Sequence, residues 1–355
     1  MITEYGFLKD KRVLFISVKF FSLEKKIEEC LINNGALVDY YDERPTNNSI
    51  VKAVIRFKKG LIEGRIRKYY LNILNSIASV DYDYLLVNKG ESVPAFFLEE
   101  FIKINPKSKR IYYNWDSFKN NKYSLENLKY FNCKFSFDPY DCKEYDLKFR
   151  PLFFIDEFKK IRYSKRNKDF HLLSISTVHS DRYDITKKIK EWCEKKELKH
   201  YVFFYIQALW YYIFRKLFDK NFKNVELKNI SFKGLSFENI CSLYESSKVI
   251  LDINHSDQKG LTIRTFEAIG AEKKIITTNK EILKYSFYNP KNIIVIERDD
   301  PSLGLRLDFF NDDYEPLPED LYDSLSINGW LKSLFDENYN DIWYNNEIIN
   351  KKNYK

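Results

Sequence analysis

The sequence predicts an α/β protein made of two doubly wound parallel-sheet domains. Strand-like and helix-like segments alternate along nearly the whole chain, in two series separated by a charged run, DEFKKIRYSKRNK. Repeated β-α-β units of this kind indicate parallel sheets covered by helices on both faces. A length of 355 residues is typical of two domains, and 44% hydrophobic and 17% aromatic residues are enough for large cores.

The first series predicts an amino-terminal domain over residues 1–155. Short apolar runs bounded by turn residues indicate its strands, and amphipathic spacing indicates its helices. We expect strands near 13–17, 37–41, 84–87, 110–113 and 134–137, with helices near 23–33, 71–78 and 94–104.

The second series predicts a domain over residues 156–315, with the charged run 156–168 as its linker. The aromatic stretch 201–217 fits either a strand or a helix. Residues 316–355 look helical and polar, and we treat them as a separate terminal segment. We expect strands near 171–176, 230–232, 249–253, 274–278 and 292–296, and helices near 185–196 and 237–245.

The segment 250–279 contains the strongest functional signal. An apolar strand runs into a polar loop, and Gly260-Leu261-Thr262 then opens a helix that contains Arg264 and Glu267. A helix start beyond a buried strand offers unpaired N–H groups and a positive dipole end to an anion. Arg264 and Glu267 share one helix face. This predicts a nucleotide-sugar site, with Arg264 at the phosphates and Glu267 at the ribose; the alternative is an ordinary surface pair beside a turn glycine.

Two further loops supply donor-site candidates. Thr177, His179 and Arg182 follow a strand and precede a helix, where they could bond phosphate or sugar. The alternative is a helix cap by Ser180 or Asp181 with neighbours that face solvent. Asn254 and Lys259, which lie in the loop before Gly260, could also touch the donor, although loop polarity alone explains such residues.

Charge and composition limit the partners and the location. The formal net charge of +8 favours anionic partners. The five scattered cysteines form no Cys-x-x-Cys pair, which favours a reducing cytosol over a disulfide framework or a zinc site. The amino terminus lacks a signal-peptide layout, and the longest uncharged apolar run, 201–214, is shorter than the ~20 residues that cross a bilayer. We expect a cytoplasmic protein, soluble or peripheral at the membrane.

Three segments resemble the two-domain GT-B glycosyltransferases, in particular a bacterial CgeB-like branch of lipopolysaccharide and capsule biosynthesis. GLTIRTFEAIGAEKKIITTN (260–279) is similar to the donor-binding stretch of these enzymes. LLSISTVHSDRY (172–183) resembles the strand and loop that open their carboxyl-terminal domain. IYYNWDS (111–117) resembles a tyrosine-rich strand near the end of their first domain.

The resemblance implies two Rossmann-like domains that face a cleft, with terminal helices that cross back onto the first domain. It implies metal-independent transfer of a sugar from a nucleotide-sugar to a glycan or glycolipid, with no cofactor. Many retaining relatives have two glutamates separated by seven residues; Glu267 matches the second, but Lys259 stands at the first. For an inverting reaction, Asp116 and Glu91 are the candidate bases, with a helix cap and an exposed loop charge as their respective alternatives.

A few observations bear on other functions. Asp81-Tyr82-Asp83 matches the metal motif of the other large glycosyltransferase fold, but it precedes a strand, so we interpret it as a solvated turn. The basic-aromatic stretches 56–70 and 210–223 fit either an anionic membrane surface or solvated helix faces. A non-transferring relative such as an epimerase or hydrolase remains the main rival. A nucleic-acid-binding protein ranks last, since no recognisable nucleic-acid-binding motif is present.

Overall fold

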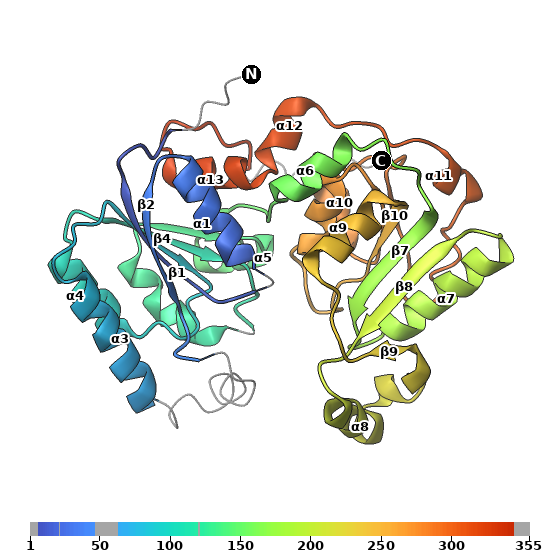
Figure 1. Cartoon of the computed structure of the whole chain (residues 1–355), viewed down its shortest axis with the longest axis horizontal. Helices are drawn as coiled ribbons and strands as arrows, with labels where there is room; N and C mark the ends of the chain where they lie inside the picture. Colours follow the sequence, from blue (N-terminus) through green and yellow to red (C-terminus); the bar gives the residue numbers. More distant parts are fainter. Residues whose placement is uncertain (1–5, 21, 47–62, 120, 344–355) are drawn as a thin grey trace. The chain divides into compact units, whose positions relative to one another are not determined.

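The computed structural model describes residues 6–20, 22–46, 63–119 and 121–343, and it divides into two compact units (Figure 1). The first unit contains Met1–Pro151 and Ile327–Asn346, and the second contains Leu152–Ser326. Each unit has one six-stranded sheet in which every neighbouring pair of strands is parallel. The predicted α/β class with two doubly wound parallel sheets is therefore confirmed.

The first sheet has the strand order β2-β1-β3-β4-β5-β6. Its central strands are apolar and buried, as expected for a parallel sheet with both faces covered. Its strands are β1 (Arg12–Ser17), β2 (Leu37–Asp42), β3 (Tyr84–Asn88), β4 (Lys109–Asn114), β5 (Cys133–Ser136) and β6 (Lys148–Phe149). Its helices are α1 (Leu23–Asn33), α3 (Glu63–Ile77), α4 (Ala95–Ile104), the 3-10 helix η2 (Lys122–Tyr130), α5 (Pro139–Tyr145) and α13 (Ile327–Phe335).

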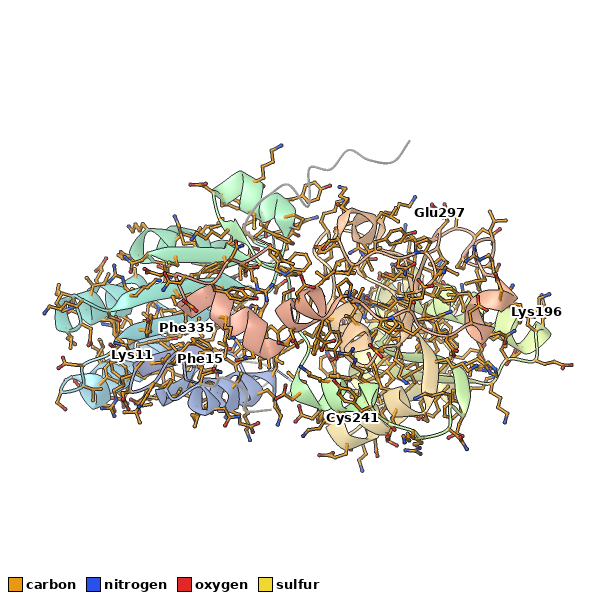
Figure 2. The ribbon with its side chains drawn as sticks, turned by 90° about the horizontal axis from the view of Figure 1, so that it is seen from above. Lys11, Phe15, Lys196, Cys241, Glu297 and Phe335 are labelled. Atoms are coloured by element: carbon orange, nitrogen blue, oxygen red, sulfur yellow. The ribbon has the colours of Figure 1, made fainter. Side chains whose placement is uncertain are left out.

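The carboxyl-terminal helix α13 belongs to the core of the first unit. The Trp330 indole packs edge-on against Tyr113 of β4, with ring centroids 4.8 Å apart. Phe335 packs edge-on against Tyr84, with ring centroids 5.0 Å apart. Phe335 and the fully buried Phe15 both belong to the first unit (Figure 2). Apolar contacts between segments far apart in sequence therefore bring the end of the described chain back to the first sheet.

The second sheet has the order β12-β11-β10-β7-β8-β9. Its strands are β7 (Phe170–Thr177), β8 (His200–Tyr205), β9 (Ile230–Ser231), β10 (Ser247–Asp252), β11 (Lys274–Thr277) and β12 (Ile293–Val295). Its α-helices are α6 (Asp156–Arg162), α7 (Arg182–Lys195), α8 (Leu209–Phe218), α9 (Phe237–Glu245), α10 (Ile263–Gly270), α11 (Leu307–Asn311) and α12 (Glu319–Ser324). Short 3-10 helices, η3 (Lys220–Phe222), η4 (Leu227–Asn229) and η5 (Lys280–Lys284), complete the unit.

Several boundaries differ from those expected. The charged run predicted to be a linker instead begins with helix α6, which buries Phe158 and Ile161 against α9 and α10. Its charges lie on the outer face, so composition alone suggested a linker where an amphipathic helix forms. The division between the units falls after Pro151 and again after Ser326, so α12 is part of the second unit. Helix α3 begins at Glu63, earlier than the predicted helix, and the basic stretch before that residue lies outside the described residues.

The aromatic stretch that fitted either a strand or a helix contains both. Strand β8 occupies His200–Tyr205, and helix α8 follows at Leu209–Phe218. The strand and the helix are separated by the short link Ile206-Gln207-Ala208, and from Leu209 onward the apolar residues follow helical spacing. This places the start of α8 just beyond the carboxyl end of β8.

Candidate nucleotide-sugar site

The second sheet has a topological switch point between β7 and β10. From β7 the chain adds strands in one direction (β8, β9), and from β10 it adds them in the other (β11, β12). The loops after β7 and β10 therefore meet at the same edge, where ligands bind in open parallel sheets. Both predicted donor loops, 177–182 and 253–262, are these two loops.

Two helices begin at this edge without a side-chain cap from their N-cap residue. The N-cap residues are Asp181 for α7 and Thr262 for α10, and neither side chain bonds the first turn. The Asp181 carboxylate instead receives two bonds of 2.8 Å from Arg298. The alternative of a capping Asp181 is thus wrong, and the amino ends of both helices lie at the switch point, where a helix start can bind an anion.

Asp252, at the end of β10, organises the start of α10. The carboxylate is 1% exposed, and its Oδ2 accepts hydrogen bonds of 2.7 Å from both the Thr262 and Thr265 hydroxyls. Its negative charge acts to raise the pKa of both Arg182 and Arg264. Asp252 was not predicted as a site residue from the sequence, because it lies within the apolar segment that was assigned to a strand.

Arg264 and Glu267 lie half-buried on the exposed side of α10, one turn apart as predicted. The Glu267 carboxylate accepts a 3.0 Å hydrogen bond from the Tyr244 hydroxyl, and Tyr244 is 1% exposed on α9. Burial raises the pKa of Glu267, and the Arg264 charge opposes that shift. Burial alone would lower the pKa of Arg264, but Tyr244, Asp252 and Glu267 together raise it. Because Glu267 is bonded to the buried Tyr244 and lies close enough to Arg264 and Asp252 to sense their charges, these residues are not an ordinary surface pair.

Arg182, the first residue of α7, bridges the two loops. Its Nε donates a 2.6 Å hydrogen bond to the Ile253 carbonyl, and burial together with Arg264 lowers the pKa of Arg182 to about 10. Burial and the Arg182 charge lower the pKa of His179 to about 3, so its imidazole is neutral at physiological pH. His179 and Arg182 are both half-buried, which contradicts the alternative that they face solvent.

Asn254 is buried, and its side chain has three partners within the protein. Its Oδ1 accepts hydrogen bonds from Thr278 (2.8 Å) and Arg298 (2.7 Å), and its Nδ2 donates to the Gln258 carbonyl (2.9 Å). Asn254 therefore holds the loop in place, and Arg298 joins it to the Asp181 end of α7. Arg298 was also missed by sequence reasoning, because it reaches this edge from beyond β12.

The other predicted donor residues lie on the same two loops with different exposure. Thr177 and Lys259 are exposed, whereas Gly260 is buried and its carbonyl accepts a 2.9 Å bond from Gln258. The Leu261 side chain is 1% exposed in the core, so only its backbone can meet a ligand. All ten residues predicted for the donor site thus lie at this edge: Thr177 ends β7, and the other nine are on the two loops or on the helices that begin there.

The two predicted bases, Glu91 and Asp116, share one lysine in the first unit. The Lys89 ammonium lies 3.4 Å from Glu91 Oε2 and 3.1 Å from Asp116 Oδ2. Glu91 is 4% exposed and also receives a 2.9 Å bond from Arg44, so the alternative of an exposed loop charge is wrong. Asp116 is the more accessible carboxylate, with 32% of its side chain exposed.

A tight turn after β3 places Lys89 in this cluster. Lys89 and Gly90 both have positive φ values, of 71° and 69°. A Cβ on Gly90 would lie 3.1 Å from the Tyr112 ring, so a side chain at this position would be crowded as well as strained. The Lys89 carbonyl is held by hydrogen bonds from Tyr112 (2.8 Å) and Asn121 (2.7 Å).

Glu43 and Arg44 are charged residues of this cluster that sequence reasoning did not select. Glu43 is the more unusual of the two. Glu43 directly follows β2, it is fully buried, and neither carboxylate oxygen has a hydrogen-bond partner among the described residues. Burial raises the pKa of Glu43 to about 7, against the opposing charges of Arg44 and Lys89. The sequence signal that could have identified Glu43 is its position just after a predicted strand, where ligand-binding residues of parallel sheets lie.

Asp81 and Asp83 lie before β3, at the opposite edge of the first sheet. Asp83 accepts a 2.8 Å bond from the Arg12 amide and pairs with Lys11 at 2.9 Å. The structure therefore gives Asp83 a role in joining strands β1 and β3, away from the charged cluster at the carboxyl edge.

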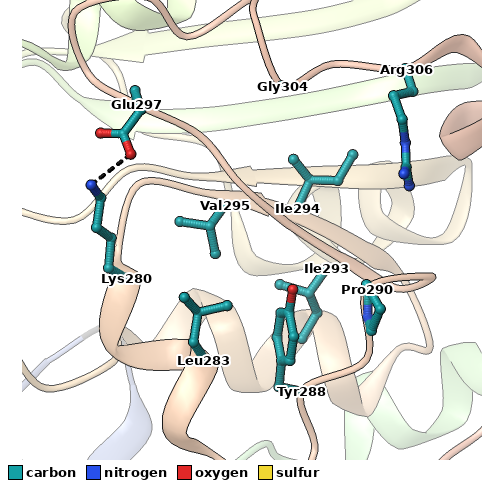
Figure 3. Close-up of a pocket in the computed structure, with 10 residues that line it drawn as sticks. All are labelled: Lys280, Leu283, Tyr288, Pro290, Ile293, Ile294, Val295, Glu297, Gly304 and Arg306. Atoms are coloured by element: carbon teal, nitrogen blue, oxygen red, sulfur yellow. Dashed lines mark ion pairs between the residues drawn. The ribbon is translucent and has the colours of Figure 1, made fainter. Parts of the chain in front are cut away.

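A surface pocket of about 510 Å³ lies beside β12, the edge strand of the second sheet, and η5 (Figure 3). Its lining includes Tyr288, Ile294 and Arg306, and an exposed Lys280–Glu297 ion pair of 2.6 Å lies at one end. It contains none of the predicted donor residues. Its apolar floor and scattered charges lack the convergent polar groups of the switch-point edge, which remains the candidate site.

Among the helices that the structure describes, none is both long enough and apolar enough to cross a membrane. No protein-family model matches the sequence, and a search of curated proteins finds no match.

Solved structures, in contrast, match nearly the whole chain. An α,α-trehalose-phosphate synthase (UDP-forming) from Burkholderia xenovorans is 10% identical over 91% of this chain and 98% of its own, with a TM-score of 0.58. An α-glucosyltransferase in complex with UDP and DNA is 12% identical over 91% and 95%, with a TM-score of 0.57. A UDP-GlcNAc 2-epimerase from Neisseria meningitidis is 10% identical over 91% and 98%, with a TM-score of 0.51. The chain therefore has the two-domain GT-B fold.

Proposed function

We propose that the chain is a glycosyltransferase that moves a sugar from a nucleotide-sugar to a cell-surface glycan or glycolipid, in lipopolysaccharide or capsule biosynthesis. The observation that supports this best is the pair of helix starts at the switch point, where Arg182 begins α7 and Arg264 lies in the first turn of α10. A diphosphate fits such an edge because backbone amides and cations can share its charge. We place the protein in the cytoplasm, at the inner face of the membrane.

The donor would lie across the loops after β7 and β10. Gly260, Thr262 and Arg264 would meet the diphosphate at the start of α10, and Arg182 would add a second cation. Glu267 would accept hydrogen bonds from the ribose hydroxyls, held in place by Tyr244. His179, which is neutral, would donate or accept a hydrogen bond at the sugar without adding charge.

The remaining donor-loop residues would act mainly through position. Thr177 and Lys259 are exposed at the rim, where they would contact the sugar. Leu261 would contribute its backbone, and Asn254 would keep the loop in its bound shape. Lys259 in place of a first glutamate favours a reaction that does not depend on that acid.

We assign the acceptor to the carboxyl edge of the first sheet and the base to Asp116. A base must reach the acceptor hydroxyl, and Asp116 has more access than Glu91 or Glu43. Glu91 would hold Lys89 against Asp116 through their shared ammonium contact. We propose that the leaving diphosphate is stabilised by helix dipoles and basic side chains without a metal ion.

A thermal-shift screen against UDP-, GDP-, CMP- and dTDP-sugars tests the donor site. We expect one nucleotide class to raise the melting temperature, and the shift to disappear in Glu267→Ala. The absence of a shift with every nucleotide-sugar, confirmed by calorimetry, would remove the proposal. Addition of EDTA should leave the shift unchanged if binding is independent of a metal.

A product assay separates transfer from the main rival. The epimerase neighbour shares the fold and was solved with UDP-GlcNAc bound, so an epimerase or hydrolase is the alternative that a specific observation supports. Incubation with the donor identified by the screen, with and without a glycolipid extract, should consume donor only when acceptor is present. Formation of an epimer or free sugar without acceptor would favour the rival.

A further inference from the structure

Helix α8 presents an apolar face that nothing in the described structure covers. Trp210, Leu217 and Phe218 are 66%, 72% and 75% exposed. Ile213 and Phe214 are each at least half exposed. The spacing of these residues places them on one side of the helix. A contiguous exposed apolar face of this kind on a folded domain indicates an interaction surface.

The opposite side of α8 is anchored in the second unit. Tyr212 is buried, and its hydroxyl donates a 3.0 Å bond to the Val225 carbonyl. Phe222 and Val225 are fully buried in a cluster with Tyr212 and residues of β8 and α7. The exposed side chains are therefore not required to hold the helix in place, and they can be changed without loss of its core contacts.

The surroundings of this face are basic. Residues 206–234 contain six basic and two acidic side chains. Asp219 is paired with Arg215, and Glu226 with Lys228, while Lys220, Lys223 and Lys233 are exposed. An apolar face that contains tryptophan and phenylalanine, bordered by lysines, matches the chemistry of an anionic lipid surface.

The helix also lies at the edge of the sheet where the donor loops meet. Thr177 of β7 pairs in register with Tyr205 of β8, and α8 starts four residues after Tyr205. The arrowheads of β7 and β8 in Figure 1 point toward the side of the unit on which α8 lies. Arg215 is close enough to contribute to the lowered pKa of His179.

We propose that the exposed face of α8 docks the second unit onto a bilayer with anionic headgroups, so that the donor edge faces the lipid surface. This inference rests on the proposed function in one respect: docking would give the enzyme access to a glycolipid acceptor. The docking itself depends on α8 and the lysines that follow it, so it can be tested without a transfer assay.

Cosedimentation of the full chain with vesicles tests the docking. We expect binding to mixed phosphatidylcholine–phosphatidylglycerol vesicles, weaker binding to pure phosphatidylcholine, and a decrease with salt. The Leu217→Ser/Phe218→Ser variant should bind the vesicles at least about tenfold more weakly than the wild type, because two apolar side chains no longer enter the interface. The matched control, Leu303→Ser/Leu307→Ser, changes two exposed leucines elsewhere in the same unit and should bind like the wild type.

A charge-reversal pair tests the electrostatic part. Lys220→Glu/Lys223→Glu should weaken binding to the anionic vesicles by about tenfold or more. Its control, Lys196→Glu/Lys199→Glu, makes the same change just after the carboxyl end of α7, whereas the donor edge is at the amino end of that helix. Lys196 and Lys199 are exposed (Lys196 is labelled in Figure 2), and this control should have little effect on binding. Trp210 fluorescence provides a direct readout, since brominated lipids should quench it and Trp210→Phe should remove the quenched component.

Equal vesicle binding by the wild type and the Leu217→Ser/Phe218→Ser variant would overturn the proposal, as would an absence of binding to anionic vesicles. A dimer in sedimentation velocity that this variant dissociates, without any vesicle binding, would assign the face to a second copy of the chain and would also overturn it. Nucleotide binding measured in parallel keeps the two proposals separate. The α8 variant should retain it, and Glu267→Ala should lose it while still binding vesicles.

Discussion

Replacement of Glu267 by alanine tests the assigned donor site most directly. Among the residues that the structure describes, the carboxylate has one hydrogen-bond partner, the buried Tyr244 hydroxyl at 3.0 Å, and the residue is half-buried. Removal of the carboxylate should therefore have two separable effects. Nucleotide binding should lose the bonds to the ribose, and the folded state should lose the partner of Tyr244.

The magnitudes follow from the groups involved. A hydrogen bond to a charged acceptor contributes about 1.5–3 kcal/mol, which corresponds to a loss of affinity of about 10- to 150-fold. A buried hydroxyl left without a partner costs about 1–3 kcal/mol of stability. Tyr244 is 1% exposed, so water cannot readily replace the carboxylate without a rearrangement of α9.

Isothermal titration calorimetry with the nucleotide identified by screening measures the first effect, and thermal unfolding measures the second. Glu272→Ala is the matched control, because Glu272 is a half-buried carboxylate in the same unit that pairs with Arg162 at 2.9 Å. It should lower stability and leave affinity unchanged. Tyr244→Phe should keep affinity within about threefold, since the carboxylate remains. The reasoning is refuted if Glu267→Ala binds the nucleotide as tightly as the wild type.

Three further substitutions test the packing and the charges. Asp252→Ala should lower the free energy of unfolding by about 2–4 kcal/mol in chemical denaturation, because two hydroxyls lose their hydrogen-bond partner and Arg182 and Arg264 lose a nearby negative charge; a change below the error of the measurement would contradict this. Gly270→Ala should cost about 1–3 kcal/mol, since its Cβ would lie 2.5 Å from Phe154, and the double variant with Phe154→Leu should recover part of the loss. The folded pKa of Glu43, about 7, is above its unfolded value, so its stabilising effect is complete below about pH 4.5 and is lost as pH rises through 7. Glu43→Gln should therefore be more stable than the wild type above pH 7, by at most about 3 kcal/mol, with no advantage at pH 4; parallel stability–pH curves would refute the assignment.

Much of the fold was predictable because its strands and helices have local patterns. The helices over 23–33 and 237–245 have their predicted bounds in the structure, and the predicted strands lie within one or two residues of the observed ones. The clearest error was the charged run, where the buried Phe158 and Ile161 are outnumbered by the charges of the outer face. Only contact with α9 and α10 makes that segment a helix of the second unit.

The candidate site was predictable in part for the same reason. Arg264 and Glu267 are neighbours on one helix, and Thr177 and Arg182 flank one loop, so their proximity follows from local geometry. Asp252 was within the predicted strand, but its role depends on which hydroxyls fold over it. Tyr244 and Arg298 come from α9 and from beyond β12, and no local pattern connects them with the loop that they hold.

The order of residues along the chain determined that there would be two parallel sheets and which loops would follow their strands. It also determined the basic, aromatic character of α8, since composition is local. Tertiary structure alone decided that β7 and β10 are neighbours, that Tyr244 supports Glu267, and that Lys89 joins Glu91 to Asp116. These contacts depend on the strand order and on the packing of helices against the sheets. That order results from the burial of apolar faces over the whole domain, so it cannot be read from any one segment.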